Sequence, residues 1–251
     1  GRPGDGKPYA FDELPPPPQT PWNSLWHFGD HDFFPNGDAA LCTMEGEVWT
    51  VSGIEGTLSK LTWRRVAAGL NQSMGLRIVD GKICVLGRDQ ITRLHDLNGD
   101  GEADFYECLC NAYTSTVGGH DFILGLQHDS EGRFVFSSSR QGVVRTSPDM
   151  KSVEVLATGL RNPNGPGLGP NGEIAVAPQE GDWTPASMVC EFIPDPKTPP
   201  HFGYGGPKTG AGGTVPPLAF LPRAEDNSSG GQCYVEGDRW GLPAGSLIHF
   251  S

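Results

Sequence analysis

The chain has 251 residues, including 36 Gly, 23 Pro and six Cys, and its formal net charge is −12. So much Gly and Pro leaves little room for long helices, and the length permits one large all-β domain or two smaller domains. The negative charge argues against a nucleic acid or an anionic membrane surface as the partner. A neutral or cationic small molecule, or a metal ion, fits the charge better. No apolar run reaches the roughly 18 residues that a membrane-spanning helix needs.

The N-terminal residues 1–26 are rich in proline, with four consecutive prolines at 15–18. This composition favours an extended arm, which we expect to be a linker or a strap lying on the domain. The chain begins with Gly1 rather than Met, which suggests a processed product whose export signal has been removed and therefore a periplasmic or extracellular location. No cysteine pair has CxxC spacing, so disulfides and buried free thiols remain alternative interpretations.

Residues 27–251 repeat one design of short apolar runs joined by tight turns. Asp-Ser-Glu-Gly at 129–132 and Pro-Asn-Gly at 170–172 separate runs rich in Val, Ile and Phe, which is a hairpin signal. Successive units begin near 31, 74, 120 and 164, and each contains about four expected strands. A period of roughly 40 to 48 residues with four strands per unit is typical of β-propeller blades. We therefore predict an all-β propeller.

The C-terminal part predicts an incomplete further blade. A Gly/Pro-rich insertion runs to Pro217, and the runs PLAFLP, QCYVEG and GSLIHFS follow it. We interpret these runs as a fifth blade interrupted by long loops, in a ring that most simply has six. The chain stops at Ser251 within an expected strand, so we expect a fragment of a longer protein, or a further domain or second chain that completes the propeller.

Polar clusters precede the first expected strand of each unit. In a propeller these loops face one mouth of the central channel, so the clusters should converge on one funnel. Turn capping by Asn and His is the alternative explanation for any single loop. The clusters contain His31 and Asp32, Gln72, His120 and Asp121, Arg161, Asn162 and Asn164, and Asp226 and Asn227.

A separate acidic segment has the spacing of a calcium-binding loop. Residues 96–104 fit the pattern D-x-N-x-D-G-x-x-D, in which alternating oxygen ligands surround the ion. Strand-like runs on both sides predict a structural calcium site within a blade. The expected ligands are the side chains of Asp96, Asn98, Asp100 and Asp104 and the carbonyl of Glu102.

Several of these motifs resemble a known family. The segment from Gly119 to Gln141 and the run Gly-Leu-Arg-Asn-Pro-Asn-Gly at 159–165 are similar to the soluble aldose and sorbosone dehydrogenases, six-bladed propellers that use pyrroloquinoline quinone. A closer resemblance is to the large predicted dehydrogenase propellers of planctomycete-type bacteria. It is carried by the run at 159–165 together with the segments LHDLNGDGEADFYE and DNSSGGQ.

This resemblance implies a sugar or polyol oxidoreductase. It gives His120 the role of general base and Arg161 and Asn162 roles at the cofactor and substrate, with Asp121 and Asn164 beside them. It also implies that the segment Gln179–Asp182 holds a cofactor calcium, with Gly181 and Asp182 offering carbonyls. A carbohydrate would be the substrate and a cytochrome a possible electron acceptor. Two alternatives stay open, a non-oxidative carbohydrate enzyme or lactonase, and a calcium-stabilised binding module.

Overall fold

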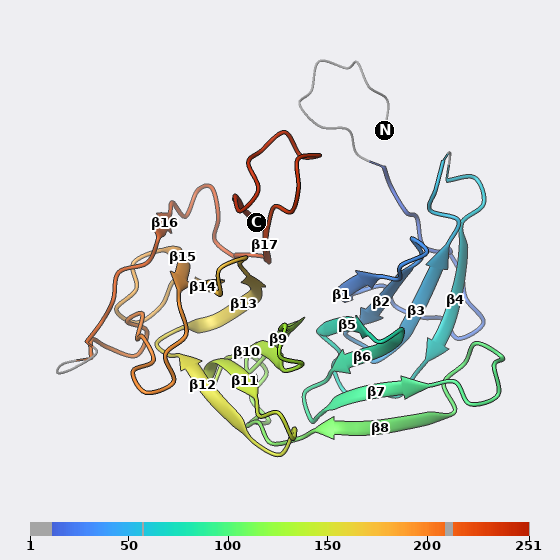
Figure 1. Ribbon diagram of the computed structural model, residues 1–251, viewed down its shortest axis with the longest axis horizontal. Helices are drawn as coiled ribbons and strands as arrows, with labels where there is room; N and C mark the ends of the chain where they lie inside the picture. Colours follow the sequence, from blue (N-terminus) through green and yellow to red (C-terminus); the bar gives the residue numbers. More distant parts are fainter. Residues whose placement is uncertain (1–11, 57, 209–212, 251) are drawn as a thin grey trace.

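The computed structural model describes residues 12–56, 58–208 and 213–250, so most of the first half of the predicted arm lies outside the described residues. All regular secondary structure in the described ranges is β. The strands form four four-stranded antiparallel sheets and one two-stranded sheet, which follow one another in chain order around a common axis (Figure 1). This arrangement confirms the predicted propeller of four-stranded blades. In these ranges no helix is long and apolar enough to cross a membrane.

Each four-stranded blade is a meander whose strands run in order from the centre to the periphery. The first blade consists of β1 (Phe28–Phe33), β2 (Ala39–Thr43), β3 (Val48–Ser52) and β4 (Thr62–Ala67). The second consists of β5 (Gly75–Val79), β6 (Lys82–Leu86), β7 (Ile91–His95) and β8 (Phe105–Cys110). The third consists of β9 (Ile123–His128), β10 (Phe134–Ser138), β11 (Gly142–Thr146) and β12 (Val153–Ala157). The fourth consists of β13 (Arg161–Leu168), β14 (Ile174–Gln179), β15 (Ser187–Phe192) and β16 (Ala219–Leu221). The two-stranded sheet pairs β17 (Gln232–Tyr234) with β18 (Leu247–His249).

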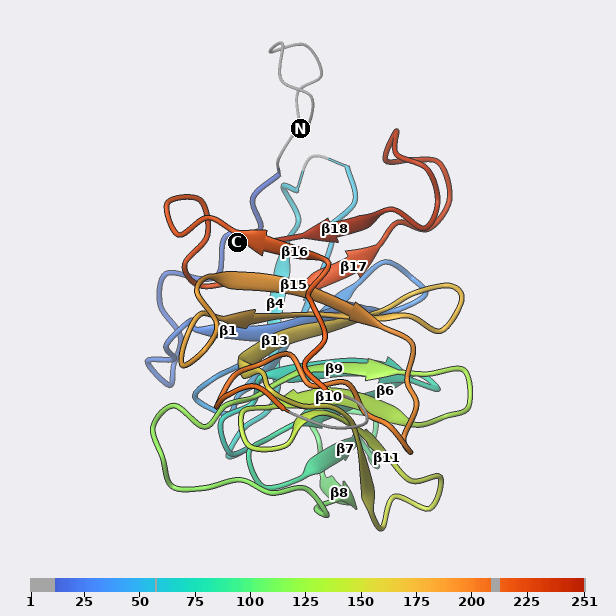
Figure 2. The same cartoon turned by 90° about the vertical axis from the view of Figure 1, so that its left-hand side faces the viewer.

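The innermost strands line the middle of the molecule. Figure 1 shows β1, β5, β9, β13 and β17 nearest the axis, with β4, β8, β12 and β16 outside. In the side view of Figure 2 the strands β1, β9, β15 and β18 run roughly along that axis. Residues at the beginnings of β5, β9 and β13 therefore lie toward one end of the channel, and residues further along these strands lie deeper in it.

The predicted hairpin turns recur at equivalent places in three blades. Gly37, Gly132 and Gly172 each follow the first strand of a blade and have φ between 80° and 89°. Each amide donates to the carbonyl three residues earlier, at 2.9 to 3.2 Å. A side chain is disfavoured at such positive φ, so glycine lets the innermost strand turn back within a few residues.

Apolar side chains are buried mainly between neighbouring blades. One cluster joins the first two blades through Cys42, Leu76 and Val85, and others join the second to the third and the third to the fourth. Burial of a Leu or Val side chain contributes about 1.5 to 3 kcal/mol. The repeat is thus stabilised by packing sheet against sheet, since no blade could bury both of its faces alone.

Three assignments differ from the sequence-based expectation. The run PLAFLP contains β16, which completes the fourth blade instead of beginning a fifth. Only the β17–β18 pair of a fifth blade is formed within the described residues. His31 and Asp32 lie inside β1, and Arg161, Asn162 and Asn164 lie inside β13, so these are strand residues rather than residues of preceding loops. Polar side chains are tolerated there because the innermost strands face the channel.

The described part of the arm lies on the first blade as a strap. The rings of Trp22 and Trp26 contact the ring of Trp49 at centroid distances of 6.0 and 4.8 Å, and the Arg65 guanidinium lies 3.5 Å from the Trp22 ring centroid. Trp49 is only 3% exposed as a result. The strap thus covers the face of the first blade that points away from the second.

All six cysteines are free thiols. Four are buried on strands, while Cys108 and Cys233 are exposed. Desolvation raises the pKa values of the Cys42, Cys84 and Cys190 thiols. The structure therefore agrees with the free-thiol interpretation.

Candidate functional site

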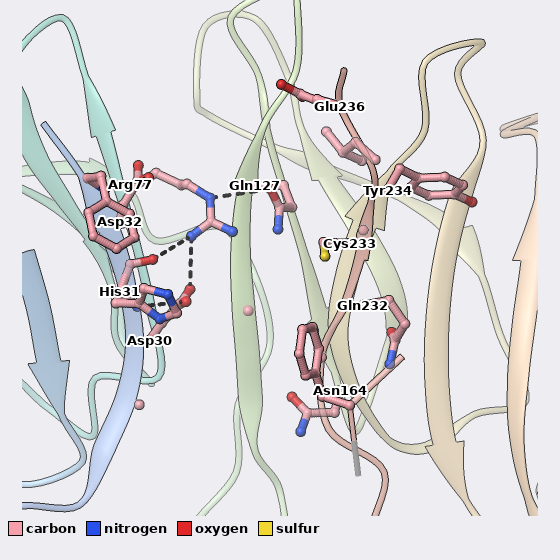
Figure 3. A pocket seen from close by; sticks show the side chains of 18 residues that line it. Asp30, His31, Asp32, Arg77, Gln127, Asn164, Gln232, Cys233, Tyr234 and Glu236 are labelled. Carbon is pink, nitrogen blue, oxygen red and sulfur yellow. Dashed lines mark hydrogen bonds and ion pairs between the residues drawn. The ribbon is translucent and has the colours of Figure 1, made fainter. Parts of the chain in front are cut away.

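A cavity of about 640 Å³ occupies the channel between the innermost strands. This volume lies within the range of small-molecule sites, roughly 300 to 1,000 Å³. Figure 3 shows its polar side chains on two facing walls, one from β1, β5 and β9 and one from β13 and the β17 segment. The labelled lining residues are Asp30, His31, Asp32, Arg77, Gln127, Asn164, Gln232, Cys233, Tyr234 and Glu236.

Asp30 ties three blades together on the first wall. Its Oδ2 accepts hydrogen bonds from the backbone amides of Leu76 at 3.0 Å and Leu126 at 3.4 Å. Its Oδ1 accepts from the amide of His31 at 2.8 Å. Because β1 supplies the carboxylate and β5 and β9 the amides, this one side chain fixes the relative position of three innermost strands. Asp32 makes a similar bond to the amide of Ile78 at 2.8 Å.

Arg77 on β5 is held in place by the residues around it. Its Nη1 lies 3.3 Å from Asp30 Oδ2 and donates to the carbonyls of His31 and Leu76 at 3.3 and 2.5 Å. Its Nε donates to Gln127 Oε1 at 3.3 Å. Among the described residues Nη2 has no hydrogen-bond partner, and Figure 3 shows it directed into the cavity.

The facing wall presents hydrogen-bond acceptors. Asn164 donates through Nδ2 to the carbonyl of Ser229 at 3.1 Å, which leaves its Oδ1 available. Gln232, 5% exposed, donates through Nε2 to the carbonyl of Gly230 at 2.7 Å and to Nδ1 of His249 at 3.0 Å. Its buried Oε1 has no partner within the described ranges.

A hydrogen-bonded chain of Asp226 and His249 fixes the Gln232 amide. His249 Nε2 and Ser229 Oγ both lie 2.9 Å from Asp226 Oδ2. Desolvation disfavours the Asp226 carboxylate, but the hydrogen bonds from His249, Ser229 and the Ser228 amide outweigh it and hold its pKa below the ordinary aspartate value. His249 donates through Nε2 to the carboxylate and accepts at Nδ1 from Gln232 Nε2, so it orients the Gln232 amide. Of the two predicted funnel residues here, Asp226 is therefore engaged in the fold and Asn227 is exposed.

The predicted base His120 lies in an exposed loop at the mouth of the channel, outside the cavity. Its ring contacts only Phe122, at a centroid distance of 6.5 Å, and its nitrogens have no hydrogen-bond partner among the described residues. The loop itself is fixed. Arg88 donates to the carbonyls of Thr116 and Gly118 and, at 3.2 Å, to Gln72 Oε1.

Asp121 anchors the far side of the same loop. Its Oδ2 accepts hydrogen bonds from Thr116 Oγ1 and, at 2.9 Å, from Arg140 Nε. The hydrogen bond from Thr116 and the guanidinium of Arg140 lower the pKa of the Asp121 carboxyl despite desolvation. Asp121 therefore holds the backbone beside His120 rather than lining the cavity.

Asn162 continues the polar network toward the later blades. Its Oδ1 accepts from Ser139 Oγ at 2.7 Å and its Nδ2 donates to Gln179 Oε1 at 3.4 Å. Gln179 Nε2 donates in turn to Ser228 Oγ at 3.2 Å. Asn162 adopts φ of 42°, a left-handed conformation that asparagine tolerates better than most residues. Side chains from the third and fourth blades and the segment before β17 are thus linked at one mouth.

Arg161 fixes the turn that follows β14. Its Nη1 donates to the carbonyl of Glu180 at 2.6 Å. A Cβ on Gly181 would lie 2.7 Å from Arg161 Cδ and from the Tyr204 ring, so a larger residue there would have to displace these side chains. The carbonyl of Gly181 accepts from the Thr184 amide at 2.9 Å, and that of exposed Asp182 accepts from the Gly205 amide at 3.4 Å. The two predicted calcium-binding carbonyls already have partners in this structure.

The acidic loop between β7 and β8 is closed on its own backbone. Asp96 accepts from the amides of Gly99 and Gly101, both at 2.7 Å, and these bonds lower the pKa of its carboxyl. Asp104 accepts from the amide of Leu97 at 2.7 Å, and Asn98 Nδ2 lies 3.2 Å from Asp100 Oδ2. The exposed Glu102 completes the segment. Within the described ranges no three His, Cys, Asp or Glu side chains gather as ligands for one metal ion.

The sequence-based prediction includes a few of the residues that line the cavity and omits most of its polar side chains. Of the predicted residues, His31, Asp32 and Asn164 line it. Asp30, Arg77, Gln127, Gln232, Tyr234 and Glu236 also line it and were not singled out. Their positions in the repeat could have revealed these residues, since each of them lies on or just after the first strand of its unit.

Comparison with known proteins supports the fold. No protein-family model matches the sequence, and no curated protein matches it. Among solved structures, the chain is similar to the pyrroloquinoline quinone-bound form of an aldose sugar dehydrogenase from Streptomyces coelicolor, with a TM-score of 0.64 and 13% identity over 84% of this chain and 72% of the other. It is also similar to an oxidoreductase described as a glucose dehydrogenase from Thermus thermophilus, with a TM-score of 0.61 and 16% identity over 84% and 73% of the two chains.

The chain is also similar in structure to a protein with a different activity. A gluconolactonase from Xanthomonas campestris matches with a TM-score of 0.53 and 14% identity over 85% of this chain and 65% of the other. Because one fold can carry several chemistries, likeness at such identities establishes the architecture alone. The chain has the β-propeller fold of the soluble aldose sugar and glucose dehydrogenases that its sequence motifs resemble.

Proposed function

We propose that the protein acts on carbohydrates as a sugar or polyol oxidoreductase of the quinone-dependent type. The observation that carries the proposal is the connected polar network at one mouth of the channel. It runs from Arg88 and the loop with His120 through Ser139 to Asn162 and Gln179. Preorganised polar groups that converge from several blades are typical of a binding site, and the structural neighbours add fold-level support.

The donor set at the mouth suits an anionic cofactor. Arg88, Arg140 and Arg161 come from three successive blades of a strongly acidic chain. Each is held by a neighbouring carbonyl or carboxylate, which reduces the ordering cost of binding. Guanidinium groups recognise carboxylates well, and pyrroloquinoline quinone carries carboxylates on a planar ring. Arg161 and Asn162 would hold it, and the cofactor, when bound, supplies a two-electron acceptor.

The chain's own residues would then manage the proton and the substrate. His120 is an exposed imidazole without a hydrogen-bond partner among the described residues, so it is available to accept a proton from a sugar hydroxyl. Arg161 and the Asn162 amide would stabilise developing negative charge on an oxygen. A cytochrome is the electron acceptor that we propose, and a further domain or second chain would extend the two-stranded β17–β18 sheet.

Calcium is part of the proposal through the loop at residues 96–104. Its side chains provide the oxygen ligands that calcium prefers. Binding there would replace the loop's internal bonds from Asp96 and Asp104 to backbone amides with metal ligation. We propose a stabilising role for this loop.

Reconstitution tests the proposal. The full chain is mixed with calcium and pyrroloquinoline quinone, and dye reduction is followed with a panel of aldoses and polyols. We expect sugar-dependent reduction that His120→Ala abolishes while the melting temperature stays within about 1 °C, because this exposed side chain has no hydrogen bond within the described ranges. His27→Ala, another exposed loop histidine, is the matched control and should retain turnover.

Two results would reject the oxidoreductase assignment, and a third would reject the role of His120. Absence of both dye reduction and a spectral change on adding the quinone rules out the oxidoreductase. Hydrolysis of an added sugar lactone, without dye reduction, would point to the lactonase alternative. Unfolding of the His120→Ala variant would show that His120 is structural.

A further inference from the structure

We propose that the interior of the channel is a second binding site, separate from the mouth, for a neutral polyhydroxylated molecule. The site lies between Arg77 on β5 and Asn164 on β13, deeper along the innermost strands than the network around His120 and Asn162. It does not depend on the redox chemistry proposed for the mouth.

The first wall offers one oriented donor. Asp30, Gln127 and two backbone carbonyls hold the guanidinium of Arg77 through Nη1 and Nε, so Nη2 projects into the cavity (Figure 3). The Arg77 side chain is 21% exposed, so a ligand in the cavity can contact it. A donor held in this way loses little conformational entropy when a ligand binds.

The second wall offers acceptors that lack donors. Asn164 Oδ1 has no protein partner among the described residues, because the Ser229 carbonyl orients the amide through Nδ2. The buried Gln232 Oε1 beside it is also without a partner, and its amide cannot reverse without losing bonds to Gly230 and His249. A buried acceptor without a donor costs free energy, so a ligand group that donates at this wall is favoured. Asn164 Oδ1 is the acceptor that a ligand hydroxyl in the cavity would meet, whereas the buried Gln232 Oε1 would gain a donor only if its side chain shifted.

The charges that line the cavity favour a neutral ligand over an anionic one. The cavity contains three carboxylates, Asp30, Asp32 and Glu236, and one guanidinium, already paired with Asp30. Three carboxylates disfavour an anion, although Arg77 alone would attract one. Hydroxyl groups are both donors and acceptors and carry no charge, so they match the two walls. The exposed rings of Phe33 and Phe250 supply apolar surface for the carbon skeleton.

Two exposed thiols make the proposal directly measurable. Cys233 lines the cavity, whereas Cys108 lies on β8 at the outside of the second blade. The full chain is alkylated with iodoacetamide at pH 9, and the rate at each thiol is measured by peptide mass spectrometry with D-glucitol, D-glucose or D-glucuronate present. The alkaline pH is needed because burial raises the pKa of the Cys233 thiol. We expect saturating D-glucitol or D-glucose to slow alkylation of Cys233 at least about fivefold and to leave Cys108 unchanged, with weaker protection by D-glucuronate.

Substitution of Arg77 tests the donor. In Arg77→Met the sugar concentration for half-protection should rise tenfold or more, about 1.4 kcal/mol of binding free energy. Arg145→Met is the matched control, because Arg145 is also ion-paired and its side chain is 16% exposed. His120→Ala should leave half-protection unchanged, which separates this site from the mouth.

Three outcomes would overturn the proposal. They are a lack of protection of Cys233 by either neutral sugar, equal protection of Cys108, and an unchanged half-protection concentration in Arg77→Met. If the buried Cys42 becomes reactive in Arg77→Met, that variant has lost its fold and Gln127→Leu takes its place. This variant frees only the Nε side of the guanidinium, and it should raise the half-protection concentration about threefold; no rise would equally refute the site.

Discussion

Replacement of Asp30 by alanine should destabilise the propeller far more than a typical surface substitution. Its carboxylate accepts bonds from the amides of His31, Leu76 and Leu126 and from Arg77. Leu76 and Leu126 are fully buried, so loss of the carboxylate would leave their amides without this acceptor. Hydrogen bonds to a charged group contribute about 1.5 to 3 kcal/mol, and an unsatisfied buried amide costs about 1 to 3 kcal/mol.

We expect Asp30→Ala to lower the free energy of unfolding by about 3 to 4 kcal/mol, allowing for the partial exposure of the carboxylate. For a chain of this size each kcal/mol shifts the melting temperature by about 2 to 4 °C, so the expected fall is about 6 to 16 °C. Differential scanning calorimetry of the full chain measures it.

Two matched aspartates separate the cross-blade bonds from general effects. Asp32→Ala loses one bond between strands of neighbouring blades, to the amide of Ile78, and should have an intermediate effect. Asp38→Ala removes a half-buried turn carboxylate that contacts Asn36, and should cost less than about 1 kcal/mol. If Asp30→Ala melts within about 2 °C of Asp38→Ala, the carboxylate does not join the blades as described.

Two further predictions concern acidic side chains, in the loop at 96–104 and at Asp226. Added calcium should raise the melting temperature of the wild type and of Asp195→Ala, an exposed turn aspartate, but not of Asp100→Ala; an equal rise in all three would exclude the loop at 96–104. For Asp226, the folded pKa lies below the unfolded value of about 3.9, so its stabilising effect is present above that pH and is lost as the pH falls through the folded pKa. Asp226→Asn should therefore melt below the wild type at pH 6, and the difference should shrink below about pH 4; a pH-independent difference would contradict the His249 pairing.

The repetition along the chain was sufficient to predict the architecture. Turns ending in Gly132 or Gly172 require positive φ, and each is followed by a short apolar strand that is almost wholly buried, so hairpins and blades follow from local chemistry. The same logic failed at β16, because a three-residue strand separated from β15 by a long insertion carries too little local signal. Which sheet such a strand joins depends on the free edge that β15 presents.

The site shows the same division between local pattern and tertiary arrangement. The sequence by itself determined that polar clusters recur near the start of the first strand of each unit, and it thereby singled out His120, Asn162 and Asn164 as candidates. Only the tertiary structure decided that Asp30 reaches Leu126 across three blades and that Arg77 faces Asn164 across a cavity. Those contacts join residues from separate repeats, and their geometry is set by sheet packing around an axis, which no local pattern encodes.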